Sequence, residues 1–310
     1  MQADQIEQVT GKSMTSKRRM IVGYAYSILS AVIYGCMPLM AKYIYAEGVN
    51  PMTLVLLRNL LALPSLAVLA YRQRGTIACP VRSVLPLGIP AFFGCVMTPL
   101  LLFSSYAFIA SGTATVFHFV YPCLVLLIGL IFLRKKAAWG TVVSVLMCLA
   151  GILLFYDPKQ TLDPAGAALA LGSGLAFAIY VVLLPRFQSK HFSGFSFCFY
   201  IALWSSIIML AICLCTGQLA LPTTWVGWGL CLLFATSVTT GAVVLFQQGA
   251  LMIGGERTSV LSALEPITGV LIGILVFEEP AKPTVLIGSV LVIASAILIA
   301  VIDLKQKKSE

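Results

Sequence analysis

The chain alternates between long apolar runs and short polar segments. The apolar runs fall at residues 20–44, 51–71, 83–109, 113–133, 137–156, 164–185, 193–215, 224–249, 258–277 and 283–303. Most are close to the roughly 20 apolar residues that a helix needs to cross a bilayer. They also lack the strict alternation of a β-barrel wall. The pattern therefore predicts an all-α polytopic membrane protein with ten transmembrane helices.

Positive charge gathers on one side of these predicted helices. If the N-terminus lies inside, the basic clusters at 12–19, 72–82, 134–136, 186–190 and 305–308 all face inward, and Lys42, Lys159 and Lys282 face outward. Cytoplasmic loops are enriched in lysine and arginine. We therefore expect a multi-pass protein of the plasma membrane with both termini in the cytoplasm. Residues 1–19 and 304–310 are predicted to be cytoplasmic tails.

Composition supports this class and excludes others. The chain is 60% hydrophobic and 10% charged, whereas soluble domains carry about 25% charged residues. Its net charge is +9, but no basic stripe interleaved with aromatic residues suggests a nucleic-acid partner. The nine cysteines form no C-x-x-C pair, which disfavours zinc or a disulfide framework. We expect no metal and no cofactor, and no phosphate-binding loop indicates an ATPase.

The two halves of the chain resemble each other at a fixed offset. Pro122 corresponds to Pro266, and Leu127-Ile128-Gly129 corresponds to Leu271-Ile272-Gly273. Five helices per half is an odd number, so the second half would cross the membrane in the opposite sense. This predicts two inverted five-helix repeats, at 20–156 and 164–303, joined by an external linker at 157–163. Inverted repeats recur in secondary transporters, with the substrate site at the repeat interface.

The layout and the stretch LEPITGVLIGILVFEEP resemble the EamA-type branch of the drug/metabolite transporter superfamily. The signature of that branch is a Glu-Pro pair, an apolar helix and a glutamate at the helix end, here Glu265, Pro266 and Glu279. Arg58 and Lys42 match an arginine in the second helix and a lysine near the end of the first. The resemblance implies a ten-helix carrier of small metabolites with a central cavity, and it names no substrate.

The first half departs from the family pattern at one point. The basic residues 134–136 stand where the family often has a glutamate. A symmetric role for Glu279 is therefore not expected.

One face of the predicted ninth helix is small and polar. Ser262, Glu265 and Gly269 recur at helical spacing, which places them on the same face. The equivalent face of the predicted fourth helix carries His118 and Tyr121. Polar faces of membrane helices point into the bundle or into a water-filled cavity. Each half is therefore predicted to supply one face of a central substrate site.

Glu265 is the leading candidate in that site, because a carboxylate inside the bilayer is costly unless it is paired or hydrated. It would bind a substrate ammonium or carry a coupling proton. The structural alternative is that it bonds backbone groups freed by Pro266. His118 is the second candidate for proton coupling, and its alternative is an interhelical hydrogen bond. Pro122 and Pro266 are predicted hinges, with fixed kinks as the alternative.

The remaining candidates for substrate binding are polar or aromatic side chains inside predicted helices. They are Tyr34, Arg58, Tyr106, Tyr121, Tyr180, Gln247, Gln248 and Ser262. Arg58 would bind an anionic group or form a structural ion pair, and the pair is favoured. For the tyrosines, packing is the favoured alternative. The Gly269-x-x-x-Gly273 spacing fits close internal packing or a dimer interface, so we expect a monomer or a homodimer.

These features together predict a secondary transporter of small metabolites that works by alternating access. Amino-acid-like or other amphipathic solutes are the first expectation, with export as the direction and a proton or counter-solute as the coupling partner. A carrier of sugars or phosphorylated compounds, with Arg58 or Lys42 binding the anion, is the alternative. A passive channel and an intramembrane lipid enzyme are less favoured. No H-E-x-x-H or G-x-S-x-G motif accompanies His118 and His191, so no enzyme is expected.

Overall fold

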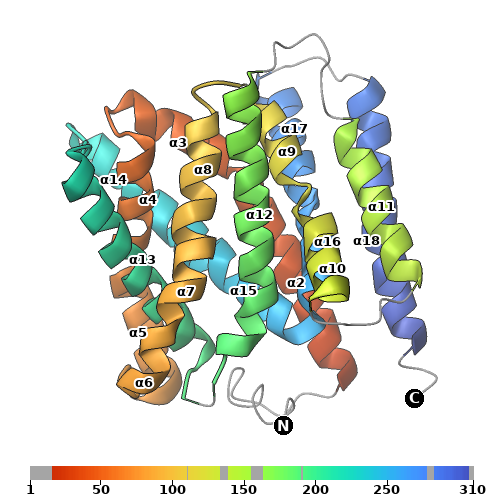
Figure 1. Cartoon of the computed structure of the whole chain (residues 1–310), viewed down its shortest axis with the longest axis horizontal. Coiled ribbons are helices and arrows are strands. Elements are labelled where there is room, and N and C mark those ends of the chain that lie inside the picture. Colours follow the sequence, from red (N-terminus) through yellow and green to blue (C-terminus); the bar gives the residue numbers. More distant parts are fainter. Residues whose placement is uncertain are drawn as a thin grey trace.

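The computed structural model describes residues 16–109, 111–132, 139–154, 163–189, 191–277 and 283–306, and every regular element in these ranges is helical. The helices form a bundle whose long elements run in roughly the same direction or its reverse (Figure 1). Several predictions lie outside the described residues: the first part of the N-terminal tail, the linker up to 162, the last residues of the chain, the basic cluster 134–136, Lys159, Lys282 and Glu279.

The first half of the chain contains α2 to α11. Its elements are α2 (Ser16–Gly35), α3 (Met37–Ala46), α4 (Pro51–Leu60), α5 (Leu63–Arg74), α6 (Val81–Val84), η1 (Leu85–Leu87), α7 (Gly88–Ala91), η2 (Phe92–Met97), α8 (Thr98–Ser105), α9 (Ser111–His118), α10 (Tyr121–Ile131) and α11 (Trp139–Leu153). Most of these are pieces of longer apolar runs, broken within the run.

The second half contains α12 to α18. Its elements are α12 (Pro164–Phe187), α13 (Gly194–Thr216), α14 (Trp225–Phe234), η3 (Ala235–Val243), α15 (Val244–Ile253), α16 (Gly255–Ser262), α17 (Leu264–Phe277) and α18 (Pro283–Gln306). Gly254 joins α15 to α16 without a loop, in a conformation with φ of +94° that side chains rarely adopt.

Seven segments among the described residues are long and apolar enough to cross a membrane. They are Arg18–Ala46, Pro51–Gln73, Val81–Ser105, Thr113–Ile131, Pro164–Phe187, Gly194–Thr216 and Trp225–Ile253. The apolar helices at Trp139–Leu153 and Leu286–Leu298 are shorter, and the predicted ninth helix is present as two pieces, α16 and α17. The all-helical, polytopic prediction is confirmed. The count of ten spans stays a prediction.

Polar caps fix where several helices begin. The side chains of Asn50, Asp163 and Thr224 each accept a backbone N–H in the first turn of α4, α12 and α14. Ser193 and Ser196 form a reciprocal capping box at the start of α13. Such caps satisfy N–H groups that have no partner inside the helix. They fall at the ends of apolar runs, where the polar segments of the sequence predict helix boundaries.

The two predicted hinge prolines each follow a break in a helix. The chain leaves α9 after His118 and resumes in α10, whose first residues are Tyr121 and Pro122. Likewise α16 ends at Ser262 and α17 begins with Leu264, Glu265 and Pro266. Proline lacks an N–H and tolerates the first turn of a helix. The prolines therefore sit where a helix restarts, and whether they act as hinges is not decided by this placement.

Two other apolar runs, one in each half, contain a π-helical segment. These are η2 in the first half and η3 in the second. In a π-segment, some backbone carbonyl groups lose the N–H donor that a regular α-helix would provide. Here Asn59 donates to the Cys95 carbonyl at 3.3 Å, and Ser30 donates to the Ala242 carbonyl at 2.8 Å. Buried polar side chains of α2 and α4 thus stabilise the two irregular segments.

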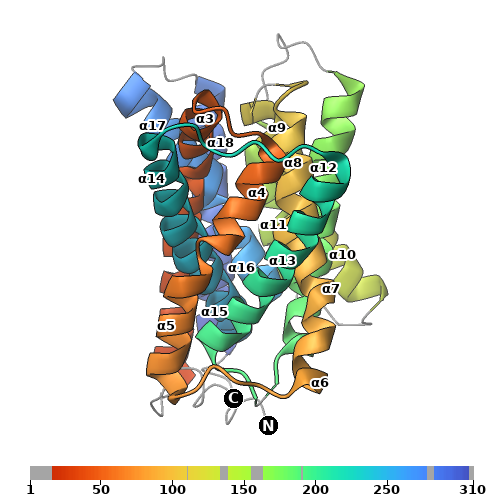
Figure 2. The same cartoon turned by 90° about the vertical axis from the view of Figure 1, so that its left-hand side faces the viewer.

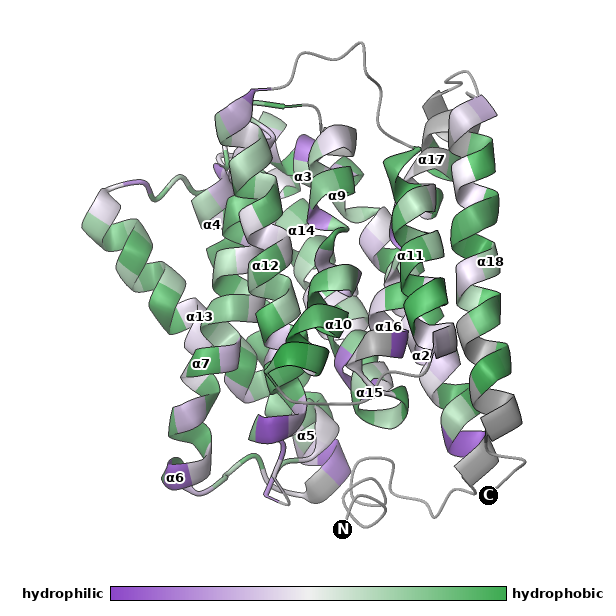
Figure 3. Ribbon diagram, turned by 45° about the vertical axis from the view of Figure 1, so that its right-hand side comes forward, coloured by the Kyte–Doolittle hydropathy of each residue, from purple (hydrophilic) through white to green (hydrophobic). Residues whose placement is uncertain are grey.

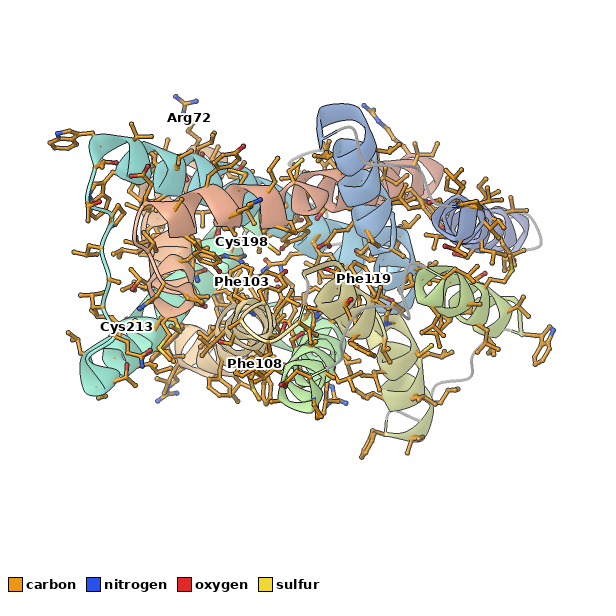
Figure 4. All side chains as sticks on the ribbon, turned by 90° about the horizontal axis from the view of Figure 1, so that it is seen from above. Arg72, Phe103, Phe108, Phe119, Cys198 and Cys213 are labelled. Atoms are coloured by element: carbon orange, nitrogen blue, oxygen red, sulfur yellow. The ribbon has the colours of Figure 1, made fainter. Side chains whose placement is uncertain are left out.

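The surface of the bundle fits a membrane environment. Green, hydrophobic residues dominate the middle of the helices, and purple, hydrophilic residues gather near α5, α6 and the C-terminal end (Figure 3). α2 begins and α18 ends at that same end of the bundle (Figure 1). Seen along the helices, exposed Arg72 projects outward, whereas buried Phe103 and Phe119 lie inside the bundle (Figure 4). The pair α11 and α18 packs together at one edge.

Candidate functional site: a central cavity between the two halves

A cavity lies in the interior of the bundle and is bounded by helices from both halves of the chain. It contains about 500 Å³ of space free of protein atoms, counting the part that opens outward. The lining residues are Tyr34, Met37, Arg58, Gly94, Thr98, Pro99, Leu102, His118, Tyr121, Phe177, Phe246, Ser262 and Glu265.

Glu265 enters the cavity from the first turn of α17, directly after the helix break. The positive end of the helix dipole favours a carboxylate at this position. The side chain is half-buried, and it forms no hydrogen bond or ion pair with any residue that the structure describes. The hydroxyl groups of Tyr34, Tyr106 and Tyr121 are close enough to interact with its charge. Glu265 is thus an acid that faces open space inside the bundle.

Arg58 reaches the same cavity from α4 and is only 4% exposed. Its Nε donates a hydrogen bond of 3.3 Å to the Thr239 hydroxyl in η3, and its guanidinium lies 5.9 Å from the ring centre of Phe234. Within the described part of the chain, no acidic side chain has an oxygen within 4.0 Å of the Arg58 guanidinium, the distance that defines an ion pair. The structural ion pair that the sequence favoured is therefore absent among these residues, and Arg58 is held by a neutral hydroxyl and an aromatic ring.

Four rings form a continuous surface on one side of the cavity, which we call the aromatic wall: His118, Tyr121, Phe177 and Phe246. The Tyr121 and Phe177 rings meet edge to face at 4.8 Å, and Phe177 lies 5.2 Å from Phe246. His118 lies 5.3 Å from Tyr121 and 5.6 Å from Phe177. Rings at such distances stabilise one another. All four line the cavity, so the wall offers an apolar surface to a bound solute.

Beneath the aromatic wall, three polar side chains join α12, α13 and α15. Gln247 donates a hydrogen bond of 2.6 Å to the Tyr180 hydroxyl and accepts one of 2.7 Å from the Cys198 thiol. The Tyr180 ring packs 5.7 Å from Phe177 and against Gly94, where any side chain would collide with it. We call Tyr180, Gln247 and Cys198 the floor cluster. It lies behind Phe177, outside the cavity lining.

The remaining sequence candidates divide between the cavity and the surrounding packing. Ser262 lines the cavity, but its hydroxyl donates to the Thr258 carbonyl at 2.9 Å. His118 lines it too, and its Nδ1 shares a 2.8 Å hydrogen bond with Ser173, the interhelical bond named as its alternative. Tyr106 packs 6.0 Å from Phe103 outside the lining.

Three further residues lie away from the cavity lining. Gln248 is buried against Gly194, and neither of its amide atoms has a hydrogen-bond partner among the described residues. Lys42 is exposed on α3, as expected for a side chain at the outer interface. Gly269 is exposed, and a Cβ added there would lie 3.8 Å from the Gly35 carbonyl oxygen of α2. The monomer or homodimer stays a prediction.

Several lining residues gave no signal in the sequence. Met37, Gly94, Pro99, Leu102, Phe177 and Phe246 are apolar or small, so they look the same whether they face lipid, core or cavity. Thr239 was missed because nothing in the sequence predicts the π-segment that turns it toward Arg58. The sequence did offer one clue to the rings. His118, Tyr121 and Phe177 belong to helices that carry polar candidates, and such helices are expected to face the interior.

Comparison with known proteins assigns a family to this fold and site. The model of the EamA-like transporter family matches twice, at residues 21–157 and 164–301. An uncharacterized transporter of Archaeoglobus fulgidus is 26% identical over 91% of this chain and 97% of its own length. The uncharacterized inner membrane transporter YicL of Salmonella typhimurium is 24% identical over 88% of this chain and 93% of its own.

Other matches are partial or concern the fold alone. The uncharacterized transporter YwfM of Bacillus subtilis is 27% identical, over 57% of this chain and 59% of its own length. A solved crystal structure is similar with a TM-score of 0.69 over 92% of this chain and 97% of that one, at 18% identity. At that identity the likeness shows a shared fold and carries nothing about the solute.

Proposed function

Because the chain belongs to the EamA-like transporter family, we propose that it is a secondary transporter that moves small polar or amphipathic solutes, amino-acid-like ones first, across the plasma membrane. The observation that carries the proposal is the unpaired Glu265 carboxylate in a cavity bounded by both halves. A charge inside a membrane protein is retained where it serves a solute, an ion or a partner charge. The names of the relatives also indicate transporters rather than enzymes.

Alternating access through two inverted halves is part of the proposal. Its support is that the family model matches each half once, and that helix breaks precede Pro122 and Pro266 at corresponding places. In addition, α2 rises from the end of the bundle where α6 lies, whereas α12 descends toward that end (Figure 1). Ten spans arranged in this way would place the cavity near the pseudo-twofold axis between the halves.

The floor cluster suggests what must move for the solute to leave on the other side. Tyr180, Gln247 and Cys198 come from three different helices, so separating those helices would open the floor below Phe177. The π-segments η2 and η3 lie next to this region, and such segments often mark functional sites. We place the expected rearrangement there, with export as the direction.

The orientation of the protein gives a direct expectation. If the termini are cytoplasmic, the loop around exposed Ala78 faces the cytoplasm and exposed Gln218 faces outward (Figure 2). In a background lacking Cys79 and Cys215, we expect a membrane-impermeant maleimide to label Gln218→Cys in intact cells. Ala78→Cys should be labelled only after permeabilisation. The reverse pattern would contradict cytoplasmic termini.

The transport proposal is tested by solute uptake into proteoliposomes that contain the purified protein. We expect at least one metabolite in a panel of amino acids, amines, sugars and phosphorylated compounds to enter with saturable kinetics. Liposomes without protein provide the control, and each solute is measured with and without a proton gradient. If no solute moves under any ion gradient, the proposed function is wrong.

A further inference from the structure

Two opposite charges face the central cavity without neutralising each other. Arg58 and Glu265 both line it, yet no ion pair joins them. The Tyr34 hydroxyl is close enough to interact with both charges. Removing either charge from water is unfavourable unless a partner replaces the lost hydration. A solute that carries both signs would supply a partner to each residue at once.

The Arg58 side chain is already oriented for an anion. Its Nε is fixed by Thr239 of η3, and the Phe234 ring lies beside the guanidinium. A guanidinium has five N–H donors in a rigid fork that matches a carboxylate. Thr239 uses one donor, and the Tyr34 hydroxyl lies within hydrogen-bonding reach of the guanidinium. The fork therefore keeps further donors for a ligand. Thr239 is therefore a positioning residue for Arg58.

The aromatic wall determines what lies between the two charged ends. His118, Tyr121, Phe177 and Phe246 present ring surface to the cavity. Burial of an apolar group against such rings is favourable roughly in proportion to the area removed from water. A solute with a large apolar or aromatic side chain would use this surface, whereas a small polar solute would leave it hydrated.

The alternative solutes fit less well. A sugar is uncharged and would leave both Arg58 and Glu265 without a charged partner. A phosphorylated compound carries about two negative charges, which Arg58 would attract and Glu265 would repel. A zwitterion matches the balance of one positive and one negative residue.

We propose that the cavity binds an amino-acid-type zwitterion with a large apolar side chain. Its carboxylate would bind Arg58, its ammonium group would bind Glu265, and its side chain would pack on the aromatic wall. This inference rests on the proposed transport function and adds the substrate class and orientation to it.

The test uses four matched probes on purified wild-type protein. Phenylalanine has all three groups, phenethylamine lacks the carboxylate, 3-phenylpropionate lacks the ammonium group, and alanine lacks the ring. Dissociation constants are measured by isothermal titration calorimetry. We expect each loss of a charged group to weaken binding by at least about 30-fold. Loss of the ring should weaken it by about 10-fold or more.

Variants then show which residue recognises each group of the solute. For each variant, the dissociation constants of two probes are compared as a ratio. In Arg58→Gln, phenylalanine and phenethylamine should bind within about 3-fold of each other, because the carboxylate has lost its partner. Thr239→Val should reduce the same ratio partially while leaving the ratio of phenylalanine to 3-phenylpropionate unchanged. Phe246→Leu should reduce the advantage of phenylalanine over alanine. Arg72→Gln, on the exterior (Figure 4), is the matched control and should behave as wild type.

The outcomes separate this inference from the transport proposal. Equal binding of phenylalanine and phenethylamine to wild type overturns the role of Arg58, as does a full 30-fold ratio that persists in Arg58→Gln. Saturable uptake of sugars or phosphorylated compounds, with none of the four probes bound, overturns the substrate class and leaves the transporter intact. Absence of uptake for every solute overturns the proposed function itself.

Discussion

Replacing Glu265 by glutamine is expected to weaken binding of the transported solute by at least about 30-fold and to lower its uptake accordingly. Glutamine is close in size and keeps hydrogen-bonding capacity, so the change removes little except the charge. Loss of one partner from a buried charge pair costs about 2–5 kcal/mol, and each 1.4 kcal/mol is a factor of ten. The measurement is the dissociation constant of the purified variant, together with initial uptake rates in proteoliposomes.

The matched control for this change is Glu47→Gln. Glu47 follows α3 at an exposed end of the bundle and accepts a hydrogen bond from Thr224, so it lies outside the cavity. It should bind and transport as wild type. If Glu265 only supports the backbone at the break before α17, Glu265→Gln would also transport normally. That result would contradict the functional role of the carboxylate.

Gly174→Ala is expected to lower the stability of the protein. A Cβ at this position on α12 would lie 2.6 Å from the backbone carbonyl oxygen of His118, closer than van der Waals contact permits. Because the obstacle is backbone, neither side can move without disturbing the break between α9 and α10. Overpacking of this kind costs about 1–3 kcal/mol. It should lower the thermal unfolding midpoint of the protein in detergent.

Gly172→Ala is the matched control, on the same helix. A Cβ there would meet only a Leu101 methyl group, at 3.5 Å, which is ordinary contact. Both changes replace a helical glycine by alanine, so the gain in helix propensity of about 1 kcal/mol is shared by the pair and cancels in the comparison. Equal midpoints for the two variants would show that α12 does not approach His118 as closely as described.

The main architecture could be predicted from the sequence because apolar run length and helix geometry decide it. The runs that begin at Pro51 and Pro164 start within a residue or so of α4 and α12, since a cap and a proline mark each start. The fixed offset relates Pro122 to Pro266, and both prolines lie in the first turn of a helix that restarts after a break. Caps and prolines act on the residues next to them in the chain, so the sequence alone is enough to recognise them.

The interior of the bundle was only partly predictable. Glu265, Arg58 and Tyr34 were found because a polar group inside an apolar run is conspicuous. The neighbours that complete the site were not, because Phe177 and Phe246 resemble lipid-facing residues until the packing is known. The structural ion pair favoured for Arg58 is not found among the residues that the structure describes. The sequence favoured an acid, whereas the π-segment η3 presents the hydroxyl of Thr239.

The central claim is that one cavity binds the solute and is exposed to each side of the membrane in turn. Counterflow measures this most directly. Proteoliposomes are loaded with unlabelled solute, and the initial entry of a labelled trace is compared with entry into empty proteoliposomes. We expect internal solute to accelerate labelled entry, because a loaded carrier returns its site faster than an empty one. Entry that is independent of internal solute and rises linearly with concentration would contradict the account and indicate a passive channel.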